Sequence, residues 1–76
     1  MDKSEIQNLI DSYRERNRMI DTQEEHYSKQ LRLAKKEDKP NMSVISDIKL
    51  TIAILDTEAS LNRTFIQQLE SLKIIP

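Results

Sequence analysis

The stretch KKEDKPNMS, residues 35–43, divides this 76-residue chain into two segments of similar length. Pro40 disfavours a continuous helix because its ring removes a backbone N–H donor and clashes with the preceding turn. It also disfavours helical geometry at Lys39. Asn41 and Ser43 are both good helix N-cap residues. The stretch therefore predicts a break near residues 38–42 between two helices.

The segments on either side of the break have the composition of helices. The chain contains no glycine and two prolines, and its many Glu, Lys, Leu, Ile, Gln and Arg residues favour helices over strands. Asp2 or Ser4 can cap a first helix at residues 4–37, and a second is predicted at residues 43–73. Helices of about 34 and 31 residues span roughly 50 and 46 Å. These matched lengths favour an all-α antiparallel helical hairpin, with residues 1–76 as a single domain.

The sequence leaves open how the hairpin closes. Without glycine, no residue offers an easy left-handed cap after the first helix. The chain can therefore fold back on itself, or straighten and exchange helices between two chains.

The first predicted helix is highly charged and carries one narrow apolar stripe. The stripe follows a heptad line of Ile6, Tyr13, Ile20, Tyr27 and Ala34, flanked by Leu9, Ile10 and Leu31. Polar side chains interrupt the seam between the two tyrosines, at Arg16, Asn17, Gln23 and Glu24. We expect this helix to bury one edge, with the tyrosines as core anchors whose hydroxyls lie at the rim.

The second predicted helix has two apolar faces. Its main stripe alternates three- and four-residue spacings and comprises Ile45, Ile48, Ile52, Leu55, Ala59, Asn62, Ile66 and Leu69. A second set centres roughly on the opposite side and comprises Leu50, Ile54, Leu61, Phe65 and Leu72. One neighbouring helix can cover only one face. We therefore expect the residues from Ile45 to Leu55 of the main stripe to pack on the first helix, and the second set to bind a partner.

Polar residues of the second helix support two further hypotheses. Asn62, among aliphatic residues of the main stripe, either fixes register or oligomeric state or marks a part of the stripe that faces water. A charged line at heptad spacing runs between the two apolar faces. We expect this line to provide partner specificity through Lys49, Asp56, Arg63 and Glu70.

A chain of this size buries only a marginal core. Small domains are commonly stabilised by disulfides, metals or association, and this chain has no cysteine and one histidine. We therefore expect the hairpin to complete a helical bundle by association. The partner is a second copy, with a dimer as the expected homo-oligomer, or another helical protein.

The sequence carries no recognisable catalytic or metal-binding pattern. His26 follows Glu24 and Glu25, but the Glu-x-x-His spacing of di-metal bundles would need a glutamate where Gln23 stands. We find no nucleophilic triad, no glycine-rich phosphate loop and no paired-acid pattern. The prediction is a non-enzymatic protein without a cofactor or a metal.

An arginine cluster at Arg14, Arg16 and Arg18 raises the alternative of RNA binding. Arg14 and Arg18 share a helix face that could contact phosphates. Interleaved acidic residues oppose this local field, and the net charge of the chain is −1. Nucleic acid is therefore not the expected partner.

The ends of the chain and its hydropathy favour a soluble protein. Residues 1–5 lack the apolar region of a signal peptide, and the apolar run Ile52–Leu55 is far shorter than a membrane span. We expect a cytoplasmic location without a membrane span, while export without a signal peptide stays open. The apolar end, residues 72–76, is either a docking tail or a frayed terminus.

The layout resembles the small helical-hairpin components of bacterial type III secretion systems, namely needle subunits and the short chaperones that keep them soluble. The resemblance rests on chain length, a charged first helix, a break containing Pro40 and an aliphatic second helix that runs to the end. Residues 60–69, SLNRTFIQQL, stand where needle subunits have their polymerising C-terminal helix. Needle subunits usually have a second proline in the break and a less charged first helix. These departures imply a chaperone-like role.

The expected function is a small interaction module, such as an adaptor, chaperone or inhibitor, that binds a partner through the second helix. Two alternatives remain. One is a structural subunit, similar to the secretion needle, that polymerises through both faces of this helix. The other is an RNA-binding hairpin dimer.

Overall fold

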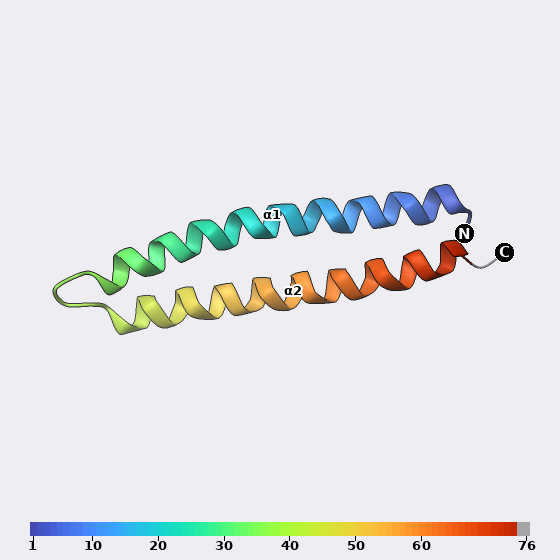
Figure 1. Cartoon of the computed structure of the whole chain (residues 1–76). Coiled ribbons are helices and arrows are strands. Elements are labelled where there is room, and N and C mark those ends of the chain that lie inside the picture. The colour runs from blue at the N-terminus through green and yellow to red at the C-terminus, as the bar shows by residue number, and fades with distance from the viewer. Residues whose placement is uncertain (75–76) are drawn as a thin grey trace.

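The structure, a computed structural model, describes residues 1–74 and shows the antiparallel helical hairpin that the sequence predicts. Within these residues the chain forms two helices of equal length, α1 (Lys3–Lys35) and α2 (Met42–Ile74), and no strand. The helices lie side by side, with the break at one end and the start of α1 beside the end of α2 at the other (Figure 1). Ile75 and Pro76, which belong to the predicted docking or frayed tail, lie outside the described residues.

The described chain is a rod with principal extents of 61 × 14 × 13 Å. Its radius of gyration is 17.4 Å, whereas a globular chain of this length would have about 11 Å. A rod has a large surface for its volume, so a large part of the apolar side chains of α2 remains outside the core.

Both helix starts are capped by side chains that the sequence offered as candidates. Asp2 is the N-cap of α1, and its Oδ1 accepts a hydrogen bond from the Glu5 backbone N–H at 2.8 Å. Asn41 caps α2, because its Oδ1 accepts bonds from the backbone N–H groups of Ser43 and Val44 at 3.1 and 3.3 Å. These contacts satisfy N–H groups that have no partner within the helix.

The chain turns without any left-handed residue among those described. α1 ends two residues earlier than predicted, at Lys35 rather than Glu37. Lys36 keeps a right-handed backbone, with φ −85° and ψ −9°, and its N–H bonds to the Leu33 carbonyl at 3.2 Å. A tighter last turn of this kind replaces the glycine cap. The hairpin therefore closes within one chain, and Pro40 lies in the connection between Lys36 and Asn41.

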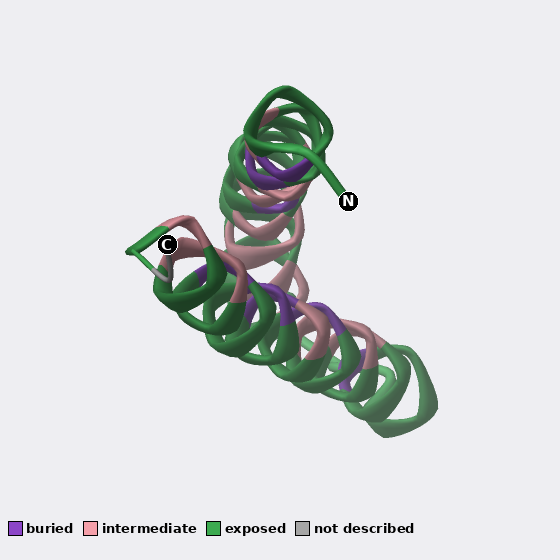
Figure 2. Cartoon of the chain, turned by 90° about the vertical axis from the view of Figure 1, so that its right-hand side faces the viewer, coloured by how far each residue is buried: buried purple, intermediate pink, exposed green. Residues whose placement is uncertain are grey.

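The core is a thin seam between the two helices (Figure 2). One cluster near the termini joins Ile6 and Ile10 to Ile66, with Tyr13 and Leu69 packed against it. A second cluster joins Ile20 to Leu55 and Ala59, with Tyr27 packed against it. Both tyrosines are half-buried, as expected of core anchors at the rim.

The main stripe of α2 faces α1, which confirms the predicted inner face. Its buried members are Ile45, Leu55, Ala59, Asn62 and Ile66, and its half-buried members are Ile48, Ile52 and Leu69. The stripe of α1 is confirmed in the same way for Ile6, Ile10 and Ile20, which are buried. The core thus uses one face of each helix.

Candidate interaction surface

An apolar groove runs along the middle of α2, outside the core. It has a volume of about 480 Å³ and is lined by Leu50, Ala53, Ile54, Thr57, Glu58 and Leu61. Leu50, Ile54 and Leu61 are 61%, 60% and 51% exposed. Side chains of this kind gain about 1.5–3 kcal/mol each when they are buried. This groove is the candidate interaction surface of the protein.

Phe65 and Leu72 of the predicted partner-binding set occupy a different place. With residues of both helices they line a smaller groove of about 190 Å³, together with Leu9, Tyr13, Gln68 and Leu69. The rings of Tyr13 and Phe65 have centroids 5.5 Å apart and are tilted by 41°. Phe65 is 39% exposed. The five predicted residues therefore divide between the groove on α2 and the junction of the two helices.

A polar network crosses the seam at its middle. Asn62 is buried, and its Nδ2 donates to Oδ1 of Asn17 at 2.9 Å. Asn17 in turn donates to the backbone carbonyl of Ala59 at 3.2 Å. Of the two hypotheses for Asn62, water exposure is wrong, because its side chain is bonded inside the hairpin.

An ion pair joins this network to the groove. Arg16 donates from Nε and Nη2 to the two carboxylate oxygens of Glu58, at 2.5 and 3.0 Å. The hydrogen bonds and charge of Arg16 lower the pKa of Glu58, and the same contact raises the pKa of Arg16. Because Glu58 also lines the groove, the only acid among the groove's lining residues has its charge compensated by α1.

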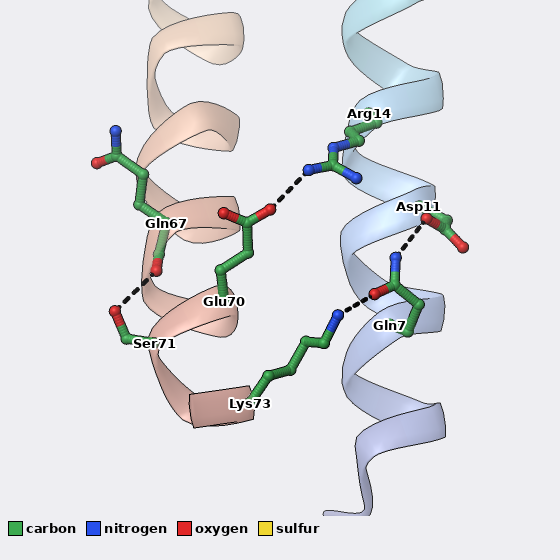
Figure 3. A network of polar contacts seen from close by, with 7 residues as sticks. All are labelled: Gln7, Asp11, Arg14, Gln67, Glu70, Ser71 and Lys73. Carbon is green, nitrogen blue, oxygen red and sulfur yellow. Dashed lines mark hydrogen bonds and ion pairs between the residues drawn. The ribbon is translucent and has the colours of Figure 1, made fainter. Parts of the chain in front are cut away.

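The charged line of α2, which is predicted to give partner specificity, lies partly against α1. Glu70 accepts a hydrogen bond and ion pair from Arg14 at 2.6 Å, and Lys73 nearby donates to Gln7, whose own amide donates to Asp11 at 2.8 Å (Figure 3). Glu70 therefore forms an ion pair that links α2 to α1.

The middle of the charged line meets an acid of α1. Glu24 is half-buried at the seam, and its pKa is raised, first by a hydrogen bond with Asp56 and then by desolvation and the charges of Asp56 and Asp21. Arg63 opposes this shift through its charge. Asp56, Arg63 and Glu70 of the line thus interact with α1, and a role of the line in partner choice stays a prediction.

The arginine cluster is largely engaged within the chain. Arg14 pairs with Glu70, Arg16 with Glu58, and Arg18 with Glu15 at 3.4 Å. His26 contacts Gln30 through Nε2 at 3.1 Å. Among residues 1–74, no group of three or more His, Cys, Asp or Glu side chains could hold a metal ion. The same residues contain no helix long and apolar enough to cross a membrane.

Sequence reasoning did not assign Ala53, Thr57 or Leu9 to the surface that they line. Ala53 and Thr57 form the low part of the groove between Leu50, Ile54 and Leu61, and Leu9 joins Phe65 and Leu72 at the helix junction. Ala53 and Thr57 are too small to stand out in a pattern of large apolar residues. Their positions three and seven residues after Leu50 could nevertheless have indicated a groove. Leu9, predicted at the flank of the core stripe, is 38% exposed.

The fold and this surface define a helical hairpin with an apolar groove on its second helix. A scan of protein-family models, a search of curated proteins and a search of solved structures each found no match to this chain. The resemblance to type III secretion components therefore stays a prediction.

Proposed function

We propose that this chain is a small protein–protein interaction module that binds a helical partner through the groove on α2. The observation that carries the proposal is the exposure of Leu50, Ile54 and Leu61 around one apolar groove. A contiguous apolar surface on a small protein is typical of an interaction site. The class includes adaptors, chaperones and inhibitors.

The mechanism is completion of a helical bundle. An amphipathic partner helix places its apolar face in a groove whose anchors recur at helical spacing. Leu50, Ile54 and Leu61 supply most of the affinity, and Phe65 with Leu72 extends the contact toward the termini. The chaperone-like role implied by the secretion resemblance is one form of this mechanism, in which the hairpin covers an apolar helix of its client.

A photo-crosslinking experiment tests the proposal in cells of the source organism. A photoreactive phenylalanine analogue is placed at Ile54, and in a second variant at Ser12, an exposed residue of α1. We expect crosslinks from position 54 to one reproducible protein species, identified by mass spectrometry, and few from position 12. With the analogue kept at position 54, the double variant Leu50→Asp with Leu61→Asp should lose that species.

A matched control carries the same charge change elsewhere. Ser12→Asp with Thr22→Asp adds two carboxylates at exposed positions of α1 and should keep the crosslinked species. Equal capture by both double variants would overturn the proposal. Regular filaments of the purified chain in electron micrographs, lost in the Ile54→Asp with Leu61→Asp variant, would favour the structural subunit instead.

A further inference from the structure

The large apolar side chains exposed between residues 50 and 65 are spaced symmetrically along α2. They are Leu50, Ile54, Leu61 and Phe65. The first two are four residues apart, Ile54 and Leu61 are seven apart, and the last two are again four apart. The pattern is the same in both directions about a midpoint between Thr57 and Glu58. When two antiparallel helices are related by a twofold axis at this midpoint, each of these four residues lies opposite another apolar residue of the set.

We infer that the free protein pairs with a second copy of itself through this face of α2, antiparallel, with the twofold axis next to Thr57. The inference rests on the proposed function, since it names one occupant of the same groove. It places Ile54 against Leu61 of the second copy, and Leu50 against Phe65 of the second copy. Each contact then occurs twice.

The groove has the form that such pairing needs. Leu50, Ala53, Ile54 and Thr57 are related as residues i, i+3, i+4 and i+7 of one helix, which is the arrangement of a four-residue hole that receives one side chain of a facing helix. Leu61 of the second copy lies opposite this hole when the axis is next to Thr57. Ala53 and Thr57 are small, so the floor of the groove stays open.

The charges at this face are compatible with self-pairing. Glu58 lies close to the axis, so two copies of it approach each other, which would be unfavourable for free carboxylates. Each Glu58, however, already accepts two hydrogen bonds from Arg16 of its own chain. Further out, antiparallel pairing places Asp47 near Gln68 of the second copy, whereas parallel pairing would place Asp47 against Asp47.

Spin labels test the arrangement, because the chain has no native cysteine. Ser60→Cys, at an exposed position that does not line the groove, and Asp47→Cys are labelled in separate samples, and distances between copies are measured by pulsed electron paramagnetic resonance. In the antiparallel dimer the labels at 60 are separated by about 5 residues along the helix axis, or roughly 8 Å, and give a short distance. The labels at 47 are separated by about 21 residues along the axis, or roughly 30 Å.

The outcomes separate this inference from the proposed function. Loss of both distances in the Ile54→Asp with Leu61→Asp background supports the inference. Equal short distances at 47 and 60 would indicate parallel pairing and overturn it. No distance between copies would also overturn it, while the proposed function would survive if Ile54 still crosslinks to another protein. A dimer with the expected distances but no such crosslink would support the inference and contradict the proposed function.

Discussion

Asn17 of α1 and Asn62 of α2 face each other at the middle of the seam, with Nδ2 of Asn62 2.9 Å from Oδ1 of Asn17. This pair joins the two halves of an otherwise apolar core, between the cluster around Ile10 and the cluster around Ile20. A shift of one helix turn would separate the two amides and bury Asn62 without a partner. The pair therefore favours one register of the hairpin.

Removal of one amide should destabilise the hairpin. Asn17→Ala leaves Asn62 buried without its bond, which costs about 1–3 kcal/mol. The double variant Asn17→Ala with Asn62→Ala should lose less than the sum of the single variants, with a coupling of about 0.5–3 kcal/mol. Urea unfolding followed by circular dichroism measures the free energy of unfolding of the two single variants and the double variant. Additive effects would show that the amides act independently. Asn8→Ala, at an exposed position, is the control.

Glu24→Gln should stabilise the protein at neutral pH. The folded pKa of Glu24 is raised by Asp56, so its favourable contribution is complete below the unfolded pKa of about 4.3 and is lost as pH rises through the folded pKa. Wild-type protein should therefore lose stability across this window, whereas Glu24→Gln should lose less. Thermal unfolding between pH 4 and pH 8 measures the difference. Glu25→Gln, at a more exposed neighbouring position, should show the same dependence of melting temperature on pH as the wild type. If Glu24→Gln also showed the wild-type dependence, this would count against the Glu24–Asp56 contact.

Glu58 should give the opposite dependence on pH. Arg16 lowers the folded pKa of Glu58, so the stability from this pair is present above the unfolded pKa and is lost as pH falls through the folded value. Arg16→Met should lower the melting temperature at pH 7, and the difference from wild type should shrink in strong acid. Arg18→Met, which removes only the surface pair with Glu15, should have a smaller effect at pH 7. A difference that is independent of pH would refute the role of the ion pair.

The apolar seam should be sensitive to small deletions. Ile10 and Ile20 have no exposed surface, and replacement of either by alanine costs about 2–5 kcal/mol. A hairpin with so thin a core should lose most of its helical signal at 25 °C in either variant. Leu33→Ala, at a position that is 66% exposed, should change stability by less than about 0.5 kcal/mol. A fully folded Ile20→Ala variant would mean that the core lies elsewhere.

The hairpin and its inner face could be predicted because local signals agreed. Pro40, the cap residues and the spacing from Ile45 to Leu69 all indicated the same arrangement. The partner of Asn62 could not be predicted, because the contact with Asn17 depends on how far each helix runs and where α1 ends. The surface was predicted in part. Ring packing between Tyr13 and Phe65 depends on the packing angle between the helices, which the periodicity of one helix does not determine.

Sedimentation equilibrium of the purified chain tests most directly whether the groove on α2 drives association. At micromolar concentration we expect the wild-type protein at a multiple of the monomer mass, with a dimer as the main species. Ile54→Asp with Leu61→Asp should sediment as a monomer, and Ser12→Asp with Thr22→Asp should behave as the wild type. A wild-type protein that is monomeric, fully helical and cooperatively folded at this concentration would contradict the association of the hairpin through α2.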